Sequence, residues 1–442
     1  MSEVLIVGAG IGGLSAAIAL GALSGAKHKV SVVEKSSVLS DVGAGIQLGP
    51  NATHLLIRWG MGQDLVDCSF EPEKLQVLSA LSGAELASTD LGSSFRQKYG
   101  APYLTLHRAD LHRMLYSRVL KEGFAQVETG QELRHFVQTQ QGVEVEFHED
   151  AKMLFDVLVG ADGVWSRVRS ILNDTHLNGT HLNDTHLEDT RLKTQLKSAQ
   201  NLFQPASFSG DLAYRSLVLQ KTLPKKLRVD SVRVWLGPNM HLVQYPVRGG
   251  EWLNSVLFID SKKLQNNPQN SHHLEPTSNL LSWDIQLNQA HLGLFFMESI
   301  NQCCAEVKDS LGALGQWRAW PIMAKAPLSS ERQMAVGRVA LLGDAAHPML
   351  PYLAQGAGMS IEDANMLGIQ FSLNPSQVDT NLILSAYSKL RWRRNAIVQK
   401  RALLNQKIFH AKGVLAVARD SSLRIFGPQL LNMPWLYGQK DN

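Results

Sequence analysis

The sequence predicts an α/β protein that combines a mostly parallel sheet with an antiparallel sheet and a helical C-terminal region. Three observations predict this fold class. A short apolar run at 4–7 leads into a glycine-rich turn, and similar runs with glycine turns recur at 156–163 and 339–344. The long stretches between them alternate polar and apolar residues, and helical periodicity dominates after about residue 360. Pieces of one parallel sheet therefore lie scattered along the chain.

Composition and charge narrow the class further. The chain has 442 residues, of which 44% are hydrophobic and 19% charged, with a formal net charge of +4. This length suggests two or three packed units, and the apolar content excludes a disordered or fibrous protein. The net charge is too small to argue for a nucleic-acid partner.

The cysteines and the N-terminal run bear on compartment. Cys68, Cys303 and Cys304 fit neither a disulfide framework nor the paired spacing of a zinc site, so we expect a reducing compartment and no metal. Residues 4–26 carry no charge, but the chain start lacks the basic segment of a signal peptide and glycines interrupt the run. We therefore expect a cytoplasmic protein with no targeting segment and no membrane partner.

The N-terminal segment has the pattern of a strand–helix–strand unit. Residues 4–7 predict a strand buried on both faces, and 14–23 predict a helix. Residues 30–33 predict a second strand, which ends at Glu34. This arrangement is typical of the first unit of a doubly wound sheet.

The turn of this unit reads Gly-x-Gly-x-x-Gly, and each glycine has its own reason. Gly8 permits a tight turn, Gly10 lets backbone amides approach a pyrophosphate, and Gly13 lets the helix pack closely on the strand. The phosphates would lie at the positive end of the helix dipole. Glu34, 21 residues beyond the last glycine, is placed to accept hydrogen bonds from an adenosine ribose. We predict a Rossmann-like dinucleotide site.

Two further segments stand out by composition. Residues 173–192 repeat a polar five-residue pattern, and a five-residue step does not keep the recurring histidines on one helix face. We therefore predict a surface loop rather than a metal site. The basic run 391–394 is interpreted as a solvated helix face rather than a binding patch.

Later motifs resemble a known family. Residues 160–169 and 343–359 resemble the two internal fingerprints of single-component flavoprotein aromatic hydroxylases. Residues 43–51, 213–217 and 235–246 are similar to salicylate hydroxylases and to relatives that act on hydroxybenzoates and hydroxynicotinate. The resemblance covers nearly the whole chain apart from the five-residue repeat. It implies a Rossmann-like FAD-binding domain with an inserted antiparallel-sheet substrate domain and a helical C-terminus.

The resemblance also implies how the chain is divided. We expect the FAD-binding domain at 1–74, 100–172 and 330–375, the substrate domain at 75–99 and 200–329, a repeat-containing surface loop at 173–199, and a C-terminal helical region at 376–442. The FAD-binding domain is thus expected to be discontinuous in sequence.

Cofactor contacts on the second fingerprint follow from the same resemblance. It implies that Asp344 binds the ribityl chain and that Pro351 shapes the flavin pocket. Residues 355–357 would open a helix that faces the flavin pyrimidine. A helix N-terminus there would stabilise the anionic reduced flavin.

Contacts elsewhere are implied in the same way. Asp162 and Gly163 would serve the nicotinamide donor together with the flavin site, and Arg108 would reach the flavin. The complete set of predicted cofactor-binding residues is Gly8, Gly10, Gly13, Glu34, Lys35, Gly45, Arg108, Asp162, Gly163, Asp344, Gln355, Gly356 and Ala357.

Candidate substrate contacts lie on the predicted antiparallel sheet. Arg215 is the best partner for a substrate carboxylate, with a structural ion pair as the alternative. His241 and Tyr245 lie two strand steps apart and face either one cavity or the core. Gln47 stands where some relatives carry a histidine base, and an amide cannot take that proton. His347 is interpreted as a positioning residue rather than a base.

The resemblance implies an FAD-dependent monooxygenase that consumes NADH or NADPH and O2. Oxygen transfer would run through a flavin C4a-hydroperoxide that attacks an electron-rich ring. The expected substrate is a small hydroxylated aromatic acid, with salicylate favoured and hydroxynicotinate or another hydroxybenzoate as alternatives. We expect a monomer or homodimer that needs no metal.

Two other functions stay open at this point. Residues 317–322 resemble the signature of a tryptophan-type flavin halogenase, but with different tryptophan spacing. A flavin-binding regulatory module without turnover is the alternative from another class, and consumption of NADH would exclude it.

Overall fold

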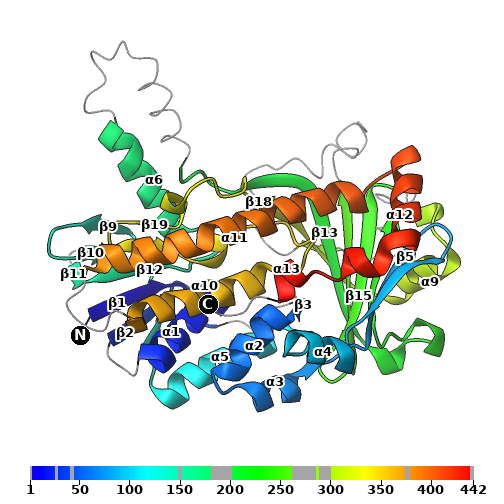
Figure 1. Cartoon of the computed structure of the whole chain (residues 1–442), viewed down its shortest axis with the longest axis horizontal. Helices are drawn as coiled ribbons and strands as arrows, with labels where there is room; N and C mark the ends of the chain where they lie inside the picture. The colour runs from blue at the N-terminus through cyan, green and yellow to red at the C-terminus, as the bar shows by residue number, and fades with distance from the viewer. Residues whose placement is uncertain are drawn as a thin grey trace, which may run out of the picture.

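The computed structural model describes residues 2–24, 28–39, 44–147, 152–180, 202–260, 285–287, 300–373 and 379–438. Figure 1 shows a parallel sheet with its helices at one end of the molecule and a large sheet at the other. Helix α11 (Thr380–Phe409) runs along both parts. The predicted α/β fold class is confirmed.

The parallel sheet assembles strands that are distant in sequence. In spatial order these are β19 (Ala335–Val336), β20 (Val339–Leu341), β12 (Val157–Gly160), β1 (Ser2–Val7), β2 (His28–Glu34) and β8 (Gln126–Thr129). Neighbouring strands are parallel except for β19 and β20, which are antiparallel. Val4, Leu5 and Ile6 have no exposed surface, as expected for a strand covered on both faces.

Two helices bring their starts to the same edge of this sheet. Helix α1 (Ile11–Ser24) packs against α10 (Gly356–Leu373) so closely that a Cβ at Gly368 would lie 2.7 Å from the carbonyl oxygen of Ala19. At the other end of the contact, a Cβ at Gly12 would lie 2.7 Å from the Leu342 side chain. The glycine turn after β1 and the residues that follow β20 are therefore neighbours.

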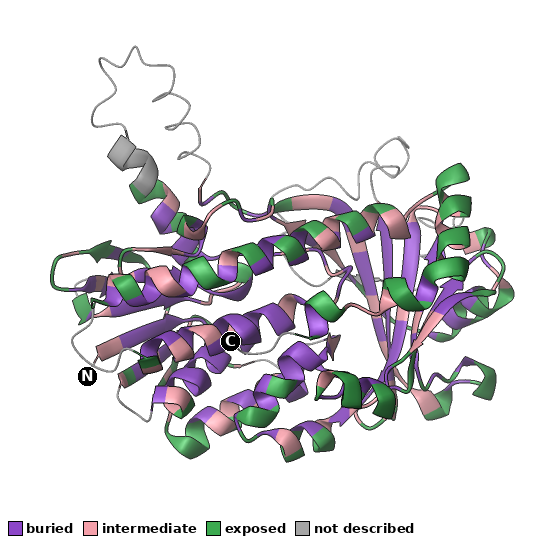
Figure 2. Cartoon of the chain, in the orientation of Figure 1, coloured by how far each residue is buried: buried purple, intermediate pink, exposed green. Residues whose placement is uncertain are grey.

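The second sheet has eight strands. In spatial order they are β17 (Ile285–Leu287), β18 (Trp317–Ala324), β13 (Ser207–Leu219), β16 (Trp252–Asp260), β15 (Met240–Val247), β14 (Val232–Gly237), β5 (Lys74–Ser79) and β6 (Glu85–Asp90). All neighbours are antiparallel except β14 and β5, which are parallel. The predicted antiparallel sheet is therefore present, with one parallel pair, because β5 enters from a distant part of the chain and no hairpin to β14 fixes its direction. Figure 2 shows that the strands of this sheet are largely buried.

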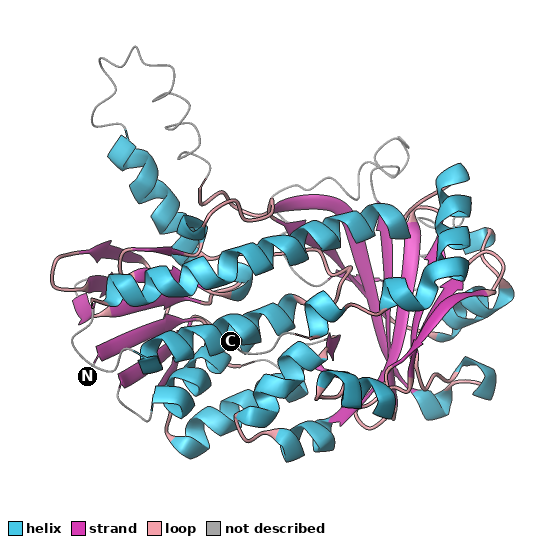
Figure 3. Ribbon diagram, viewed as in Figure 1, coloured by secondary structure: helices cyan, strands magenta, loops and turns pink. Residues whose placement is uncertain are grey.

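Smaller elements connect the two parts. The short strands are β3 (Gly45–Leu48), β4 (Ser69–Phe70), β7 (Leu104–His107), β9 (His135–Gln138), β10 (Val143–Glu146) and β11 (Lys152–Phe155). The further helices are α2 (Pro50–Arg58), α3 (Gly62–Cys68), α4 (Ser93–Tyr99), α5 (Arg108–Glu122) and α9 (Ala305–Ala313), with 3-10 turns η2 (Gln220–Thr222), η3 (Lys225–Leu227), η6 (Glu331–Gln333) and η7 (Gly343–Ala345). Strand β7 runs directly into α5, and Thr105 of β7 donates to the Pro246 carbonyl of β15 at 2.5 Å. The small sheet β3-β7-β4 therefore contacts the large sheet through β15 and leads into α5, which packs on α1. Figure 3 shows strands (magenta) in both parts of the molecule, with helices (cyan) around them.

The C-terminal region is helical, as predicted, with α12 (Val414–Leu431) and α13 (Pro434–Tyr437) after α11.

The loop predicted at 173–199 is wrong for residues 173–180, because α6 (Arg167–Thr180) extends through them. Asn, Asp and Thr each cost a helix less than about 1 kcal/mol, so a helix that is already started continues into the polar repeat. Residues 181–199 lie outside the described residues. No helix in the described part is long and apolar enough to cross a membrane.

Candidate active site

The turn between β1 and α1 has one open glycine and two crowded ones. Gly8 has a φ of +106°, and a Cβ there would lie 2.5 Å from the Ala161 carbonyl oxygen. A Cβ at Gly13 would lie 1.9 Å from the Gly8 carbonyl oxygen, so the helix packs on the turn as predicted. Gly10 has no atom within 4 Å of its Cβ position. The backbone at Gly10 therefore borders open space at a helix N-terminus, where a phosphate binds well.

Glu34 holds this turn while remaining partly accessible. Its Oε2 accepts from the Ala9 amide and its Oε1 from the Ser36 amide, both at 3.0 Å. Each carboxylate oxygen keeps a lone pair for a ribose hydroxyl. Lys35 is exposed beside it. His112 of α5 supports the same turn, with its Nε2 2.7 Å from the Ala9 carbonyl oxygen; no motif in the sequence singles this histidine out.

Asp162 lies five residues before helix α6 and binds the amides of its first turn. Its Oδ2 accepts from the amides of Arg167 and Val168 at 2.7 and 3.1 Å, which is a helix-capping role that the sequence did not predict. Its Oδ1 is buried with no hydrogen-bond partner among the described residues, and burial raises the pKa of the carboxyl. The adjacent Gly163 has a φ of +77° and open space at its Cβ position. This turn therefore keeps one acceptor and one open backbone position for a ligand.

Arg169 connects the two fingerprints. It is 2% exposed, and its Nη1 donates to the carbonyl oxygens of Asp344 and Ala345 at 3.2 and 2.6 Å. Its Nη2 donates to the Val164 carbonyl oxygen. Arg169 is not among the predicted site residues, although it lies inside the first fingerprint.

The Asp344 carboxylate lies within electrostatic range of two arginines and one histidine. Burial raises the pKa of Asp344, while His347, Arg108 and Arg169 act to lower it. Arg108 is the first residue of α5, is exposed, and also influences the pKa of Arg215. Arg108 thus lies within electrostatic range of both Asp344 and Arg215, which places the predicted ribityl contact and the predicted substrate contact around a common arginine.

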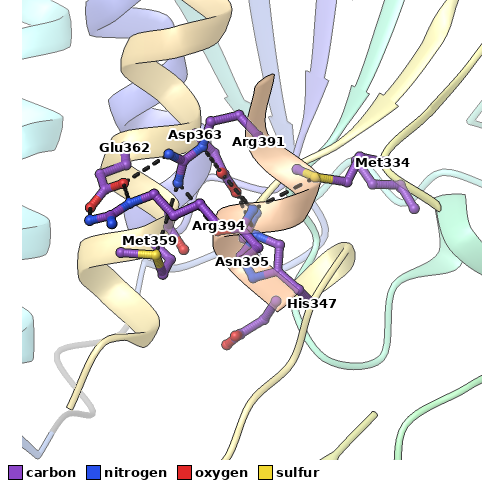
Figure 4. A network of polar contacts seen from close by, with 12 residues as sticks. Met334, His347, Met359, Glu362, Asp363, Arg391, Arg394 and Asn395 are labelled. Carbon is purple, nitrogen blue, oxygen red and sulfur yellow. Dashed lines mark hydrogen bonds and ion pairs between the residues drawn. The ribbon is translucent and has the colours of Figure 1, made fainter. Parts of the chain in front are cut away.

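Two of the three arginines in the basic run of α11, Arg391 and Arg394, are buried, whereas Arg393 is exposed. Figure 4 shows Arg391 and Arg394 directed at two carboxylates of α10. Arg391 Nη1 lies 2.8 Å from Glu362 Oε2, and Arg391 Nε lies 2.7 Å from Asp363 Oδ1. Arg394 Nη2 lies 2.7 Å from Glu362 Oε1. The predicted solvated face is wrong for Arg391 and Arg394, because their partners lie on another helix and a buried arginine is stable only when paired in this way.

The same network fixes the turn that carries Asp344. Asp363 Oδ2 accepts from the Gly343 amide at 3.2 Å and lies 2.5 Å from His347 Nε2 (Figure 4). Burial alone would raise the pKa of Asp363, but His347 and Arg391 hold it well below its usual range. These contacts agree with a positioning role for His347, as expected from the sequence.

Helix α10 begins where the sequence predicted. Its first residue is Gly356, whose Cβ position is open, and Gln355 precedes it. Asn51 of α2 donates from Nδ2 to Gln355 Oε1 at 3.0 Å and to Glu362 Oε1 at 2.8 Å. Pro351 lies in the turn before the helix, where its carbonyl accepts from the Ala354 amide at 3.0 Å. The start of α10 therefore points its amides at open space, with Ala357 in its first turn.

On the large sheet, Arg215 lies beside Trp320 and Tyr245. Its guanidinium lies 3.6 Å from the ring centroid of Trp320, and its Nε is buried without a hydrogen-bond partner among the described residues. Burial lowers the pKa of Arg215 to about 9, although Tyr245 nearby raises it. Tyr245 hydrogen-bonds Gln47, which also accepts from the Tyr103 hydroxyl at 2.6 Å. This group offers one cation and several neutral polar groups.

Gly45 is a packing residue of this group. Its amide donates to Asn254 Oδ1 at 2.8 Å, and a Cβ there would lie 2.6 Å from the Tyr245 ring. A side chain at this position would push β3 away from the large sheet. The cofactor contact predicted for Gly45 stays a prediction, and its observed neighbours are on the substrate side.

His241 lies on the same face of β15 as Tyr245 but in a separate cluster. Four residues of a strand span about 13 Å. The His241 ring stacks on Phe258 at 4.5 Å, and its Nδ1 lies 2.9 Å from His410 Nε2. Burial lowers the pKa of His241 well below its usual value. The structure brings Arg215 and Tyr245 together and places His241 against α11 instead.

Comparison with known proteins identifies the family. A model of the FAD binding domain matches residues 1–204 and 297–402. The chain belongs to this FAD-binding family. Its 3-hydroxybenzoate 6-hydroxylase relative from Aquipseudomonas alcaligenes is 32% identical, over 99% of this chain and 98% of the relative. Another 3-hydroxybenzoate 6-hydroxylase, from Polaromonas naphthalenivorans, is 29% identical over 98% of this chain and 95% of the relative.

Solved structures show the same fold for this FAD-binding protein. A salicylate hydroxylase substrate complex superposes with a TM-score of 0.74 at 22% identity, covering 99% of this chain and 96% of that one. HpxO from Klebsiella pneumoniae, with FAD and uric acid, gives a TM-score of 0.73 at 23% identity, covering 96% of this chain and 93% of HpxO. With the family match and the relatives, these findings confirm the predicted class: the chain is an FAD-dependent aromatic-ring monooxygenase.

The observed site fits FAD. Open glycine backbone occurs at Gly10, Gly163 and Gly356, two of them at helix starts that attract negatively charged groups. The buried Oδ1 of Asp162 and the Asp344 carboxylate add acceptors for hydroxyl groups. These positions are contributed by β1, β12 and β20 and the elements that follow them, which lie at one edge of the parallel sheet.

Proposed function

We propose that this monooxygenase hydroxylates a hydroxybenzoate, with NADH or NADPH as electron donor and O2 as the oxygen source. The observation that carries the proposal is Arg215. It is a half-buried guanidinium, stacked on Trp320, whose Nε has no partner among the described residues. A planar carboxylate satisfies such a fork with two parallel hydrogen bonds.

The neutral polar groups beside Arg215 suit the other end of the substrate. Burial raises the pKa of Tyr245 far above the working range, so its hydroxyl stays protonated and donates or accepts hydrogen bonds without carrying charge. Gln47 and Tyr103 provide further hydrogen-bonding groups at the same place. A benzoate ring with a hydroxyl substituent would bind Arg215 through its carboxylate and the neutral polar side chains through its hydroxyl. None of these residues acts as a base at neutral pH, so the phenol proton would leave through a bound water.

FAD would be held by the Gly10 turn, Glu34, Arg108, Asp344 and the start of α10. When bound, it accepts electrons from the nicotinamide donor and activates O2 for transfer to the ring. The chain itself supplies orientation. Arg215 and its neighbours would hold the reacting ring carbon at near-attack distance.

The relatives favour 3-hydroxybenzoate as the first compound to test, ahead of salicylate. Full-length relatives in two organisms carry the name 3-hydroxybenzoate 6-hydroxylase. A relative in Streptomyces platensis, 29% identical over 99% of this chain, is a 3-amino-4-hydroxybenzoate 2-monooxygenase. The likeness to salicylate hydroxylase is 22% and supports the fold. A benzoate with a ring hydroxyl or amine is the chemistry that these relatives share.

The test measures NAD(P)H oxidation and aromatic products with 3-hydroxybenzoate, salicylate and the neutral amide of each. We expect stimulation by an acid, no stimulation by its amide, and a dihydroxybenzoate product from 3-hydroxybenzoate. Salicylate turnover would instead release CO2 and give catechol. Donor consumption would also exclude a regulatory module without turnover.

Arg215 variants test the carboxylate contact itself. Removing a buried charge-assisted hydrogen bond costs roughly 1.5–3 kcal/mol, so Arg215→Ala should raise KM about tenfold or more for the acid. Arg215→Lys should recover part of this loss because the charge remains but the fork is lost. Equal turnover of acid and amide, or an unchanged KM in Arg215→Ala, contradicts the proposed contact.

A further inference from the structure

Helix α13, the last helix of the described residues, packs against Tyr103, a residue of the proposed substrate site. Tyr437 of α13 is 7% exposed, and its ring meets that of Tyr103 edge-on, with centroids 6.3 Å apart and planes at 86°. It also meets Phe95 at 5.5 Å and 71°. Tyr103 is the residue whose hydroxyl donates to Gln47. Helix α13 therefore packs against a side chain of the proposed substrate site.

The backbone of the same helix is held by a buried arginine. Arg394 Nη1 donates to the Trp435 carbonyl oxygen at 3.1 Å, and Nη2 donates to the Leu436 carbonyl oxygen at 2.9 Å. The same guanidinium binds Glu362 through Nε and Nη2 at 2.5 and 2.7 Å. Arg394 is 9% exposed and Leu436 has no exposed surface, so the bonds to Leu436 and Glu362 are buried, whereas the bond to Trp435 is partly buried. Figure 4 shows this arginine between α10 and α11.

The contact continues from Glu362 to the flavin side of the site. Asn51 donates one hydrogen bond to Glu362 and another to Gln355, the residue before α10. An uninterrupted series of contacts thus runs from α13 through Arg394 and Glu362 to the start of α10. A second series runs from Tyr437 to Tyr103. The first series ends at Gln355 and the second at Tyr103.

We propose that α13, held by Arg394, is a positioning element: it fixes the placement of Tyr103 and of the start of α10, and thereby the geometry of the proposed substrate site. The inference rests on the proposed function. Tyr437 and Arg394 touch neither substrate nor cofactor in this arrangement, and they act through Tyr103 and Gln355. The Tyr437 ring fixes the orientation of the Tyr103 ring by an edge-to-face contact. Small errors in position are costly at such sites, because reacting atoms must lie within near-attack distance.

The decisive variant is Tyr437→Leu, which keeps an apolar side chain but removes the ring that contacts Tyr103. Binding is measured by titrating the FAD-loaded full chain with 3-hydroxybenzoate and following the flavin absorbance, without NAD(P)H. We expect Kd and KM for the acid to rise about three- to tenfold. The hydrogen peroxide released per NAD(P)H should also rise, while FAD affinity changes little.

Two matched substitutions separate positioning from general destabilisation. Tyr437→Phe keeps the ring and should bind the acid as the wild type does. Phe426→Leu makes the aromatic-to-leucine change in the same C-terminal region at a side chain that is 56% exposed, and it should change nothing. If Tyr437→Leu binds the acid as tightly as Phe426→Leu, the positioning inference is overturned.

Arg394→Lys provides an independent test through the other series of contacts. Lysine keeps the charge opposite Glu362 but cannot bond two backbone carbonyls and a carboxylate with one planar fork. We expect weaker acid binding and a shifted flavin spectrum in the folded variant, and wild-type values for both would overturn the inference even if Tyr437→Leu does not fold. If no hydroxybenzoate perturbs the wild-type flavin, the proposed function fails and this inference with it. If the wild type responds and both variants match it, only the inference fails.

Discussion

Glu34 shows how one side chain serves both the fold and the proposed cofactor site. The sequence predicted it as a ribose contact from its distance to the glycine motif. The structure adds hydrogen bonds from the Ala9 and Ser36 amides, so the carboxylate also shapes the turn that borders the open side of Gly10. Arg215 shows the same combination, because stacking on Trp320 fixes a guanidinium whose Nε lacks a partner among the described residues.

Replacing Glu34 by alanine should weaken FAD binding about tenfold or more. The change removes charge-assisted hydrogen bonds worth roughly 1.5–3 kcal/mol, both to the turn and to the proposed ribose hydroxyls. Fluorescence titration of the apoprotein with FAD measures the effect. Glu251→Ala makes the same change at an exposed glutamate outside the predicted cofactor set; it is the control and should bind FAD as the wild type does. Wild-type affinity in Glu34→Ala would rule out the ribose role.

At the scale of elements, the pairing of α10 with α11 holds the second fingerprint in place. Asp363 collects hydrogen bonds from the Gly343 amide and Asn395 and contacts His347 and Arg391. All of these lie in a region without solvent access. The two helices therefore fix the Asp344 turn by charge pairing in addition to apolar packing.

Asp363→Asn should lower the free energy of unfolding by about 3 kcal/mol at pH 7, because it leaves buried Arg391 and His347 without this charge. The effect should depend on pH. The pKa of Asp363 in the folded protein lies below its ordinary value of 3.8, so its stabilisation is complete above that pH and is lost as the pH falls further.

The measurement is urea unfolding of both proteins between about pH 3 and pH 7. The difference in unfolding free energy should shrink on the acid side of about pH 4. Glu3→Gln removes the exposed pair with Lys29 and should cost less than about 1 kcal/mol. A difference between wild type and Asp363→Asn that stays constant down to pH 3 would contradict the assignment.

At the scale of the whole molecule, distant segments meet at one site. The parallel sheet supplies the Gly10, Asp162 and Asp344 turns, and the large sheet supplies Arg215 and Tyr245. The strand β7 contacts the large sheet and leads into α5, which starts with Arg108. The repeat begins within α6, and its part beyond Thr180 lies outside the described residues.

Deleting residues 181–192 should leave FAD binding and turnover close to wild type. The segment is a polar repeat, and halving a loop changes its closure free energy by only about 0.6 kcal/mol. The deletion begins at 181 because α6 includes the residues up to Thr180. FAD stoichiometry, NAD(P)H oxidation and melting temperature are the readouts. Loss of soluble protein on deletion would show that the repeat packs against the fold.

Local sequence alone determined the parts of the protein whose physics is local. The apolar strand before Gly8, the glycine geometry of the first turn and the helix that starts at Gly356 depend on neighbouring residues, and each lies where the sequence predicted it. The resemblance also led to the correct family, because its motifs are short and contiguous. Arg215 and Tyr245 were selected for their residue types and strand positions, and they lie together.

Tertiary structure decided everything that depends on partners far away in the chain. The basic run at Arg391 and Arg394 has the same sequence whether it faces water or two carboxylates, and only the packing of α11 on α10 determines which. Likewise, nothing near Lys74 states that β5 pairs in parallel with a strand more than 150 residues later. The contact between Tyr437 and Tyr103 likewise forms only when α13 packs next to the segment that leads into β7. Pairing and burial are properties of the assembled molecule, because both depend on which surfaces meet.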